Sequence, residues 1–493
     1  MTGTLETSSG TAGAARKPPV AAVLAAVGIP MFMATLDNLV VANALPVIKH
    51  DLGASLTDLQ WFVNAYTLAF ASLLLTASAL GDRLGRRRLF MIGISVFTAA
   101  SAACAMASEP WMLILFRAIQ GFGAAAIMPL SLTLLSASVP EKMRSAAIGI
   151  WGGISGLGVA LGPVVGGAVV SGLSWQWIFW LNVPIGIVAV PLVARVLSES
   201  YGGARRLDVV GLLLSAGGVL AVVWGVIHGA DDGWTSAVVL GGLLGGAALL
   251  VAFIAWELRV TDPMLHLRMF RNRGFSVINA VAFTFAVGVF GSIFLLVQYF
   301  QVVQGYTPLQ SGIRTLPWTM APMVVAPLAG LIVDRVGPRV LVATGQVFLA
   351  AALGWMAMIT TVDVSYGSFV LPFILGGIGM GLTFAPTATV VMASASSDDQ
   401  GMASGANNTI REVGVAMGVA VLASVFASHG GYTTPQSYVD GLAPAIGVGA
   451  VIVAVGAVVA LFLPGRKGLL SKIATAARCE AERDSEPGLA PLH

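Results

Sequence analysis

The stretch LGDRLGRRRLF, at residues 80–90, places one acid, two glycines and four arginines between two long apolar segments. A shorter copy, VDRVGPR, follows at residues 333–339, again where an apolar segment ends. The matching charged positions are Asp82, Arg83 and Arg86 in the first copy, and Asp334 and Arg335 in the second. Each copy follows the second apolar segment of its own group of six. An internal repeat of this kind predicts a chain built from two related halves.

The composition places most of the chain in a membrane. Hydrophobic residues make up 57% of the sequence and charged residues only 10%, whereas a soluble domain carries about 25% charged residues. The 59 glycines fall largely within the apolar segments, where small residues let membrane helices approach closely. We therefore expect an all-α polytopic membrane protein with a packed helical bundle.

A membrane span needs about 20 apolar helical residues, and fourteen segments of the chain meet this requirement. They form a group of six, a pair, and a second group of six. The segments are residues 20–48, 57–79, 89–107, 111–135, 144–171, 176–198, 208–228, 236–257, 275–301, 310–333, 340–361, 367–392, 403–428 and 442–463.

The basic residues orient these segments. With the N-terminus in the cytoplasm, 22 of the 26 Lys and Arg residues fall in the tails or in cytoplasmic loops. Basic residues favour the cytoplasmic side, so both termini are predicted to be cytoplasmic. We expect no cleaved signal peptide, because the first residues lack an early apolar core followed by a small-residue cleavage site. The predicted divisions are a disordered tail (1–18), a six-helix bundle (19–199), a two-helix insertion (200–265), a second six-helix bundle (266–465) and a tail (466–493).

Two charged residues lie inside the predicted spans of the first group. Asp37 stands in TLDNLVVANALP, at residues 35–46, and Arg117 stands in LILFRAIQGFG, at residues 113–123. Measured from the outer end of each span, the depths of the two residues in the membrane differ by about 6 Å, a distance that one arginine side chain can bridge. Intramembrane charges are expensive and mark functional sites. We expect the two to pair, although snorkelling of Arg117 to the outer interface is an alternative.

The fifth span carries glycines at intervals of four. Gly158, Gly162 and Gly166 would form a flat strip for close contact with another helix, and Pro163 removes one backbone hydrogen bond and permits a bend. In the thirteenth span, Glu412 lies about 14 Å deep at helical rise. Its neighbour Arg411 points about 100° away around the helix, so we expect each to meet another helix or a cavity.

These motifs together resemble those of the major facilitator superfamily, and more closely the fourteen-span drug:proton antiporters. The resemblance covers nearly the whole chain. It implies two pseudo-symmetric six-helix bundles with two extra inserted helices. It also implies that Asp82, Arg83 and Arg86 form a latch that stabilises the outward-facing state, with Asp334 and Arg335 in the second copy.

The resemblance extends to the other motifs. It implies proton transfer near Arg117, and it identifies an antiporter signature that is typical of exporters, formed by Gly158, Gly162, Pro163, Gly166 and Gly167. We assign proton coupling to Asp37, with Arg117 and Glu412; for Glu412 a substrate role is equally open. The candidate substrate-cavity residues are Met33, Asn43, Gln120, Trp318, Asn407, Asn408 and Arg411.

The expected activity is export of hydrophobic drugs, dyes or antibiotics, driven by the proton gradient without a cofactor. The expected partners are a small amphiphilic substrate, protons and membrane lipid, with no nucleic acid, and we expect a functional monomer in the bacterial inner membrane. No nucleophile–base pair, phosphate loop or metal constellation indicates an enzyme, and the two cysteines and five histidines show no metal-ligand spacing. The alternatives are a dedicated exporter of a secondary metabolite and a relative that moves lipid or acts as a sensor.

Overall fold

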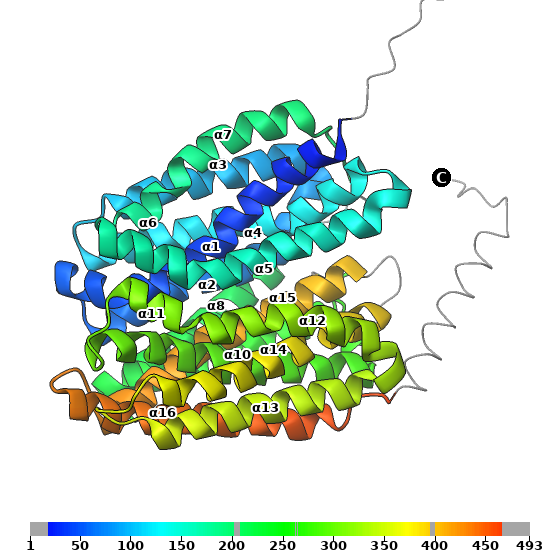
Figure 1. Cartoon of the computed structure of the whole chain (residues 1–493). Helices are drawn as coiled ribbons and strands as arrows, with labels where there is room; N and C mark the ends of the chain where they lie inside the picture. The colour runs from blue at the N-terminus through cyan, green and yellow to red at the C-terminus, as the bar shows by residue number, and fades with distance from the viewer. Residues whose placement is uncertain (1–17, 202–207, 262, 264, 395–399, 466–493) are drawn as a thin grey trace, which may run out of the picture.

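The computed structural model describes residues 18–201, 208–261, 263, 265–394 and 400–465. All regular elements within these ranges are helices (Figure 1), which confirms the all-α prediction. Twelve of the described helices are long and apolar enough to cross a membrane, or thirteen when the bent pair 56–84 counts as one span. The expected count of fourteen spans therefore remains a prediction. The expected tails at 1–18 and 466–493 lie almost entirely outside the described residues.

The first half of the molecule occupies the upper part of Figure 1. In it α2 packs against α4, α3 against α4 and α7, and α1 against α5. The predicted sixth span consists of two helices, because the helical hydrogen bonding is interrupted at Leu181. The helices are α1 (Val20–Leu52), α2 (Leu56–Leu84), α3 (Arg86–Ala105), α4 (Pro110–Ser138), α5 (Glu141–Gly172), α6 (Trp177–Trp180) and α7 (Asn182–Val196).

The second half lies below it, with α10 packed against α15 and α16, and α14 against α12 and α13. The predicted tenth span is also broken, here into α11 and α12 at Thr315. A 3-10 helix (Leu267–Arg271) precedes this half. Its helices are α10 (Arg273–Val302), α11 (Pro308–Arg314), α12 (Leu316–Val336), α13 (Pro338–Ile359), α14 (Gly367–Ala393), α15 (Gln400–His429) and α16 (Pro435–Ala460).

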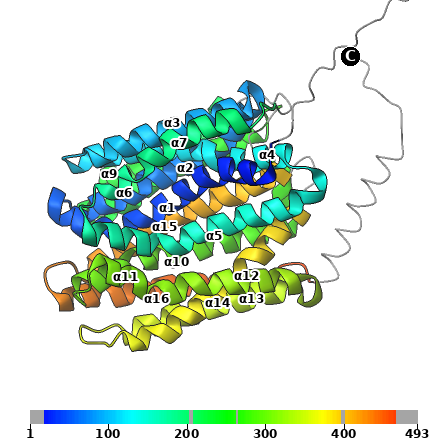
Figure 2. The same ribbon diagram turned by 45° about the horizontal axis from the view of Figure 1, so that its top comes forward.

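The inserted pair consists of α8 (Val209–Asp232) and α9 (Ala237–Glu257). Gly242 and Gly246 of α9 face α8, where an added Cβ would lie 3.2 Å and 2.8 Å from backbone carbonyl oxygens. On its other side α8 contacts both α2 and α15, and Ser424 Oγ donates a hydrogen bond to the Val226 carbonyl at 3.0 Å. α15, drawn in orange, lies against α2 (Figure 2). The inserted helix α8 therefore covers a seam between the two halves.

The two copies of the charged loop have the same backbone turn. Gly85, between α2 and α3, has φ 108°, and Gly337, between α12 and α13, has φ 94°. Side-chain-bearing residues rarely adopt this region, so glycine permits each sharp turn. The repeat read from the sequence is thus present in the backbone conformation.

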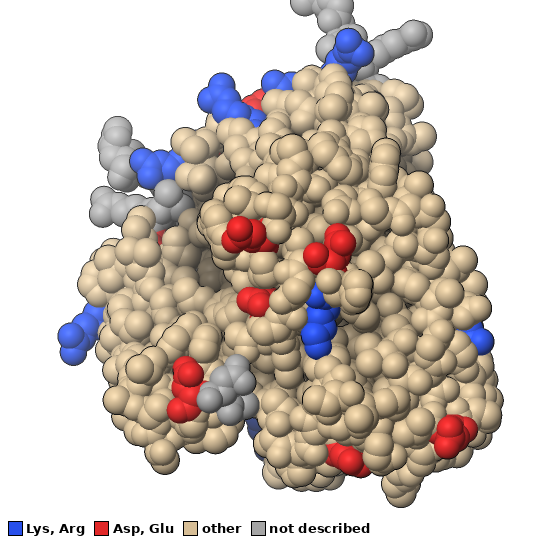
Figure 3. All heavy atoms as spheres, turned by 90° about the vertical axis from the view of Figure 1, so that its left-hand side faces the viewer, with Lys and Arg blue, Asp and Glu red and all other residues tan. Residues whose placement is uncertain are grey.

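The end of the molecule that holds these two loops is called the inner end below, and the opposite end is the outer end. Figure 3 faces the outer end, and acidic side chains lie across its centre. The exposed acids Asp51, Glu109, Asp363 and Asp440 lie in or near loops of this end. This distribution accords with the predicted orientation of the chain in the membrane, although the orientation itself remains a prediction.

Candidate functional site

Asp37 of α1 and Arg117 of α4 form an ion pair inside the first half. Arg117 Nη1 lies 2.5 Å from Asp37 Oδ2, and the two side chains are 0% and 1% exposed. Arg117 Nε also donates a hydrogen bond to the Phe62 carbonyl at 3.1 Å. The structure thus brings together the two charges that the sequence paired. The snorkelling alternative is wrong, because the guanidinium is buried against this carboxylate.

Amide side chains complete the surroundings of the carboxylate. Asp37 Oδ1 accepts hydrogen bonds from Gln120 Nε2 at 2.9 Å and from Asn182 Nδ2 at 2.7 Å. Ser101 Oγ accepts from the same two amides, at 3.4 Å and 2.9 Å. Side chains of α4 and α7 therefore bind the carboxylate, and Ser101 of α3 binds the two amides. Removing a charge from water is costly, and these charge-assisted hydrogen bonds compensate for that cost.

The sequence did not identify Asn182 or Ser101 as site residues. Asn182 opens α7 and is 2% exposed, and Ser101 in α3 is fully buried. The available signal was a polar side chain in an apolar span, which requires a partner inside the membrane. The partner itself could not be named, because the sequence does not say which faces of α3 and α7 turn toward Asp37.

The glycine strip of α5 packs directly on another helix, as its spacing predicted, and that helix is α1. An added Cβ at Gly158 would lie 3.1 Å from Thr35 Cβ, and one at Gly162 would lie 2.7 Å from Leu39 Cβ. At Gly166 it would lie 3.0 Å from the backbone Cα of Val40. A backbone neighbour cannot be moved aside as a side chain can. The strip therefore fixes α5 against the helix that carries Asp37.

The other residues of this motif join the two halves at the outer end. An added Cβ on Gly167 would overlap the Pro308 carbonyl of α11, and one on Gly312 would overlap the Pro163 carbonyl. Asn43 Nδ2 donates a hydrogen bond to the same Pro163 carbonyl. This hydrogen bond and the two close contacts hold α1, α5 and α11 together.

Two side chains of the second half complete the closure at the outer end. Gln301 Nε2 donates to the Asn43 carbonyl at 2.9 Å. Lys49 Nζ lies 3.1 Å from the centre of the Tyr432 ring, a cation–π contact. Burial raises the pKa of the Tyr432 phenol, so the ring under Lys49 stays neutral. The first half is thus fastened to the second at this end.

A cavity of about 890 Å³ lies between the two halves. It extends along α12 from Thr315, near the outer end, to Gly330, near the inner end. Most of its surface is apolar, and both halves supply aromatic rings. The first half contributes Tyr66, Phe70 and Trp151, and the second contributes Phe290, Trp318, Phe373 and Phe384. A cavity of this size and character can hold a drug-sized molecule.

Arg411 and Glu412 of α15 both line this cavity and pair with each other. Arg411 Nη2 lies 2.9 Å from Glu412 Oε1, and the side chains are 28% and 9% exposed. The expectation that neighbours in sequence would not face each other was therefore wrong. Although the Cβ atoms diverge around the helix, the long arginine side chain folds back to reach the carboxylate. The cavity wall consequently carries one ion pair.

Trp318 and Arg411 line the central cavity as predicted, but the other candidates lie elsewhere. Asn407 and Asn408 line a separate cavity of about 150 Å³, which Arg411 also borders. For three other residues the predicted place in the substrate cavity is wrong, because their side chains face other helices. Met33 packs in the apolar core of the first half, Asn43 bridges helices at the outer end, and Gln120 binds the ion pair.

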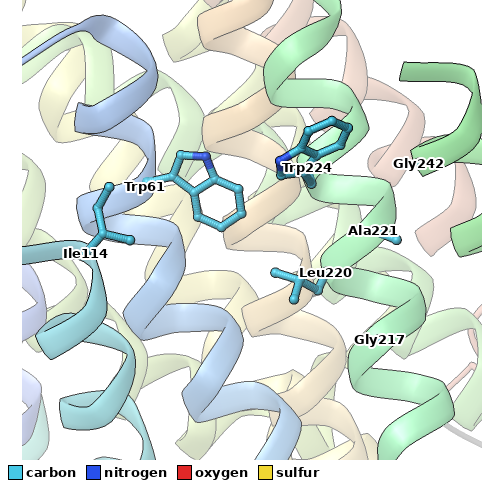
Figure 4. A pocket seen from close by; sticks show the side chains of 7 residues that line it. All are labelled: Trp61, Ile114, Gly217, Leu220, Ala221, Trp224 and Gly242. Carbon is cyan, nitrogen blue, oxygen red and sulfur yellow. The ribbon is translucent and has the colours of Figure 1, made fainter. Parts of the chain in front are cut away.

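A recess of about 600 Å³ lies between α2, α4 and the inserted helices (Figure 4). Its walls are apolar and include Trp61, Ile114, Leu220 and Trp224. The central cavity differs from this recess in carrying charged side chains, so we assign the candidate substrate site to the central cavity. Among the described residues, no group of three His, Cys, Asp or Glu side chains could hold a metal ion.

The first charged loop makes contacts on both sides of its turn. Arg86 Nε of α3 lies 2.7 Å from Asp82 Oδ1 of α2, across the turn at Gly85. Glu199, which follows α7, accepts hydrogen bonds from the backbone amides of Arg87 at 2.8 Å and Arg88 at 3.2 Å. Glu199 was not among the predicted residues, while the predicted latch residue Arg83 is exposed. The latch role itself remains a prediction.

The second charged loop repeats one contact of the first, in which Arg87 Nη1 donates a hydrogen bond to the Leu197 carbonyl, just beyond α7, at 3.0 Å. Arg339 Nε donates a hydrogen bond to the Leu463 carbonyl, just beyond α16, at 2.8 Å. Arg335 is exposed, and the side chain of Asp334 lies outside the described residues. Each loop is thus tied to the last helix of its own half.

A helical membrane protein whose two halves enclose a central cavity, with a buried charge pair inside one half, has the architecture of a secondary transporter. The comparison with protein families agrees. The model described as Major Facilitator Superfamily matches residues 27–419, and the chain belongs to this family. Members of the family are transporters rather than enzymes.

Curated relatives cover most of this chain. The tetracenomycin C resistance and export protein of Streptomyces glaucescens is 34% identical over 426 residues, 86% of this chain and 79% of the relative. The multidrug resistance protein Stp of Mycobacterium tuberculosis is 38% identical over 407 residues, 82% of this chain and 75% of the relative.

A solved structure of a bacterial homologue of the human lysosomal transporter Spinster, inward-facing and unoccupied, gives a TM-score of 0.66. It is 16% identical and covers 92% of this chain and 98% of that one. At this identity the likeness shows the fold alone.

Proposed function

We propose that this protein exports hydrophobic drugs, dyes or antibiotics from the cytoplasm by alternating access, in exchange for protons. The observation that carries the proposal is the aromatic cavity between the halves, beside a carboxylate sealed inside one half. An apolar cavity favours amphiphilic molecules without demanding one shape. Relatives described as multidrug resistance and antibiotic export proteins support the same activity.

Asp37 is the proposed proton carrier. Arg117 and the two amides bind the carboxylate, and protonation would remove the charge that holds this cluster together. Protons arriving from the outer side would thus be exchanged at a site that cargo does not enter. Glu412 and Arg411 have a different proposed role, because both line the cavity. There they contact cargo and select it by charge.

The remaining assignments are part of the same proposal. The proton gradient supplies the energy, no cofactor is needed, and the partners are amphiphilic cargo, protons and lipid rather than nucleic acid. We place the protein in the bacterial inner membrane as a functional monomer with both termini in the cytoplasm. The distribution of Lys and Arg supports this orientation. The repeat of the charged loop supports two six-helix bundles with an inserted pair of helices, which is the organisation expected of a fourteen-span drug:proton antiporter.

A second candidate is a dedicated exporter of one secondary metabolite that gives its host self-resistance. The names of two relatives favour it, the tetracenomycin C protein and a probable actinorhodin transporter of Streptomyces coelicolor. Breadth separates the two candidates. A multidrug exporter lowers the accumulation of several unrelated dyes and antibiotics, whereas a dedicated exporter acts on one compound class.

The test is efflux of preloaded ethidium from a pump-deficient bacterial host that expresses the protein, with a vector-only host as the control. We expect faster efflux with the protein, and loss of that difference when a protonophore collapses the proton gradient. Efflux that continues at the same rate after the collapse would rule out proton antiport. Equal accumulation of ethidium, tetraphenylphosphonium and puromycin in both hosts would rule out multidrug export.

A further inference from the structure

Tyr66 separates the central cavity from the buried ion pair. This side chain of α2 is 3% exposed and forms part of the cavity wall. Its ring also contacts Arg117, whose Cζ lies 4.3 Å from the ring centre. A molecule in the cavity can therefore touch Tyr66, and Tyr66 in turn touches the arginine that binds Asp37.

The ion pair has no direct contact with cavity contents. Asp37 is 2% exposed and Arg117 is fully buried, and neither borders the cavity in this structure. The Asp37 carboxylate accepts hydrogen bonds from Arg117, Gln120 and Asn182. Cargo and proton thus occupy separate sites. Exchange between them requires a residue that senses both.

The contact with the ring matters for Arg117 in particular. Arg117 Nη2 is buried and has no hydrogen-bond partner among the described residues. The face of an aromatic ring attracts a guanidinium group, most strongly where water is excluded. The Phe179 ring is more distant, 6.0 Å from Arg117 Cζ. The Tyr66 ring is therefore the nearer of the two aromatic contacts of a guanidinium whose Nη2 has no hydrogen-bond partner among the described residues.

Tyr66 is also connected to the helix that carries the acid. Its hydroxyl donates a hydrogen bond to the Ala34 carbonyl of α1 at 3.4 Å. Phe70, one turn further along α2, lies nearly parallel to the Tyr66 ring, with centroids 6.2 Å apart, and lines the same cavity. The charged groups that act on the Tyr66 phenol are Asp37 of α1, Arg117 of α4 and Glu412 of α15.

We propose that Tyr66 is the positioning residue through which cargo in the cavity and the proton on Asp37 exclude each other. The inference rests on the proposed proton antiport. Cargo against the wall holds the ring on Arg117 and favours the paired, ionised carboxylate. Protonation of Asp37 neutralises the carboxylate and releases Arg117, so the ring is free to move into the cavity and displace cargo. When the pair forms again, the proton leaves to water.

The test measures how binding of radiolabelled chloramphenicol, an aromatic antibiotic without net charge, depends on pH in the purified full-length protein. A neutral probe does not compete with protons by its own charge. Competition with one proton changes affinity at most about tenfold per pH unit. In the unmodified protein we expect chloramphenicol to bind more tightly at higher pH, and the slope of log affinity against pH to be close to this limit. In Tyr66→Leu we expect a change below about twofold per pH unit.

Two further variants separate positioning from structure. Tyr66→Phe keeps the ring face and loses only the hydroxyl, so it should keep the steep pH slope. Phe70→Leu alters the same cavity wall without removing the ring on Arg117. We expect it to weaken binding by a similar factor at every pH and to leave the slope unchanged.

The outcomes distinguish the inference from the proposed function. A steep slope in the unmodified protein that persists in Tyr66→Leu overturns the role of Tyr66 and leaves proton antiport intact. Equal flattening in Tyr66→Leu and Phe70→Leu overturns it as well, since any change in the wall would then suffice. A flat slope in the unmodified protein overturns proton antiport together with the inference. A steep slope lost only in Tyr66→Leu supports both.

Discussion

Each half of the molecule carries an acid–arginine pair, and the two pairs have opposite surroundings. Asp37 and Arg117 in the first half are 1% and 0% exposed, whereas Glu412 and Arg411 in the second are 9% and 28% exposed. The first pair is enclosed by amides, and the second lies on the cavity wall. A sealed pair can exchange a proton without meeting cargo. A pair on the wall can meet cargo without controlling the proton.

The two charged loops share a backbone turn and one arginine contact, and they differ in their remaining side-chain contacts. In the first, an ion pair joins Asp82 to Arg86 and Glu199 binds the start of α3. In the second, Arg339 binds a backbone carbonyl beyond α16. Internal symmetry therefore preserves the turn at Gly85 and Gly337, and the arginine two residues after each glycine binds a backbone carbonyl beyond the last helix of its half. The Asp82–Arg86 pair is not repeated, because Pro338 stands in the place of Arg86. The comparison predicts that the halves contribute unequally to transport.

The largest effect is expected from Asp37→Asn. Asparagine fits the same space and can still bind Arg117, but it cannot take up a proton. Gradient-driven ethidium export in inverted membrane vesicles should fall to the background of vesicles without the protein. Asp440→Asn is the matched control, because Asp440 is an exposed acid at the outer end and should retain full export. Proton-driven export by Asp37→Asn would show that another group carries the proton.

The sequence predicted the helical membrane fold and the partnership of Asp37 with Arg117, because both rest on simple physical limits. Apolar length defines a span, and a charge inside the membrane needs a partner within side-chain reach. The spacing of Gly158, Gly162 and Gly166 predicted close contact with another helix, but it did not predict that this helix is α1.

What the sequence could not supply was the direction in which each helix face points. Met33 and Gln120 were placed in the cavity and lie in the packed first half. Tyr66 borders the cavity and the ion pair at once, yet in sequence it is one aromatic residue in an apolar span. The Arg411–Glu412 pair depends on a side-chain conformation, which helical periodicity alone does not determine.

An intermediate effect is expected from Glu412→Gln, which leaves Arg411 unpaired on the cavity wall. Binding of cationic ethidium should weaken about fivefold, in line with about 1 kcal/mol for a partly exposed charge pair. Binding of neutral chloramphenicol should change by less than about twofold. Arg411→Gln should shift ethidium binding in the opposite direction. Loss of proton exchange in Glu412→Gln, with chloramphenicol as cargo, would remove the division of roles between the two pairs.

The smallest effect is expected from Asp82→Asn in the first charged loop. Asp82 and Arg86 face each other across the turn at Gly85 and are about a quarter exposed, and exposed ion pairs contribute about 0.5 kcal/mol. The equilibrium between conformations should therefore shift about twofold. We expect ethidium turnover in vesicles to change by this factor while its affinity stays constant. Arg83→Gln is the control, because Arg83 is exposed and its loss leaves the Asp82–Arg86 pair intact. Asp82→Asn makes the loop more positive and Arg83→Gln makes it less positive, so changes of similar size and opposite sign would assign the effect to the net charge of the loop rather than to the pair.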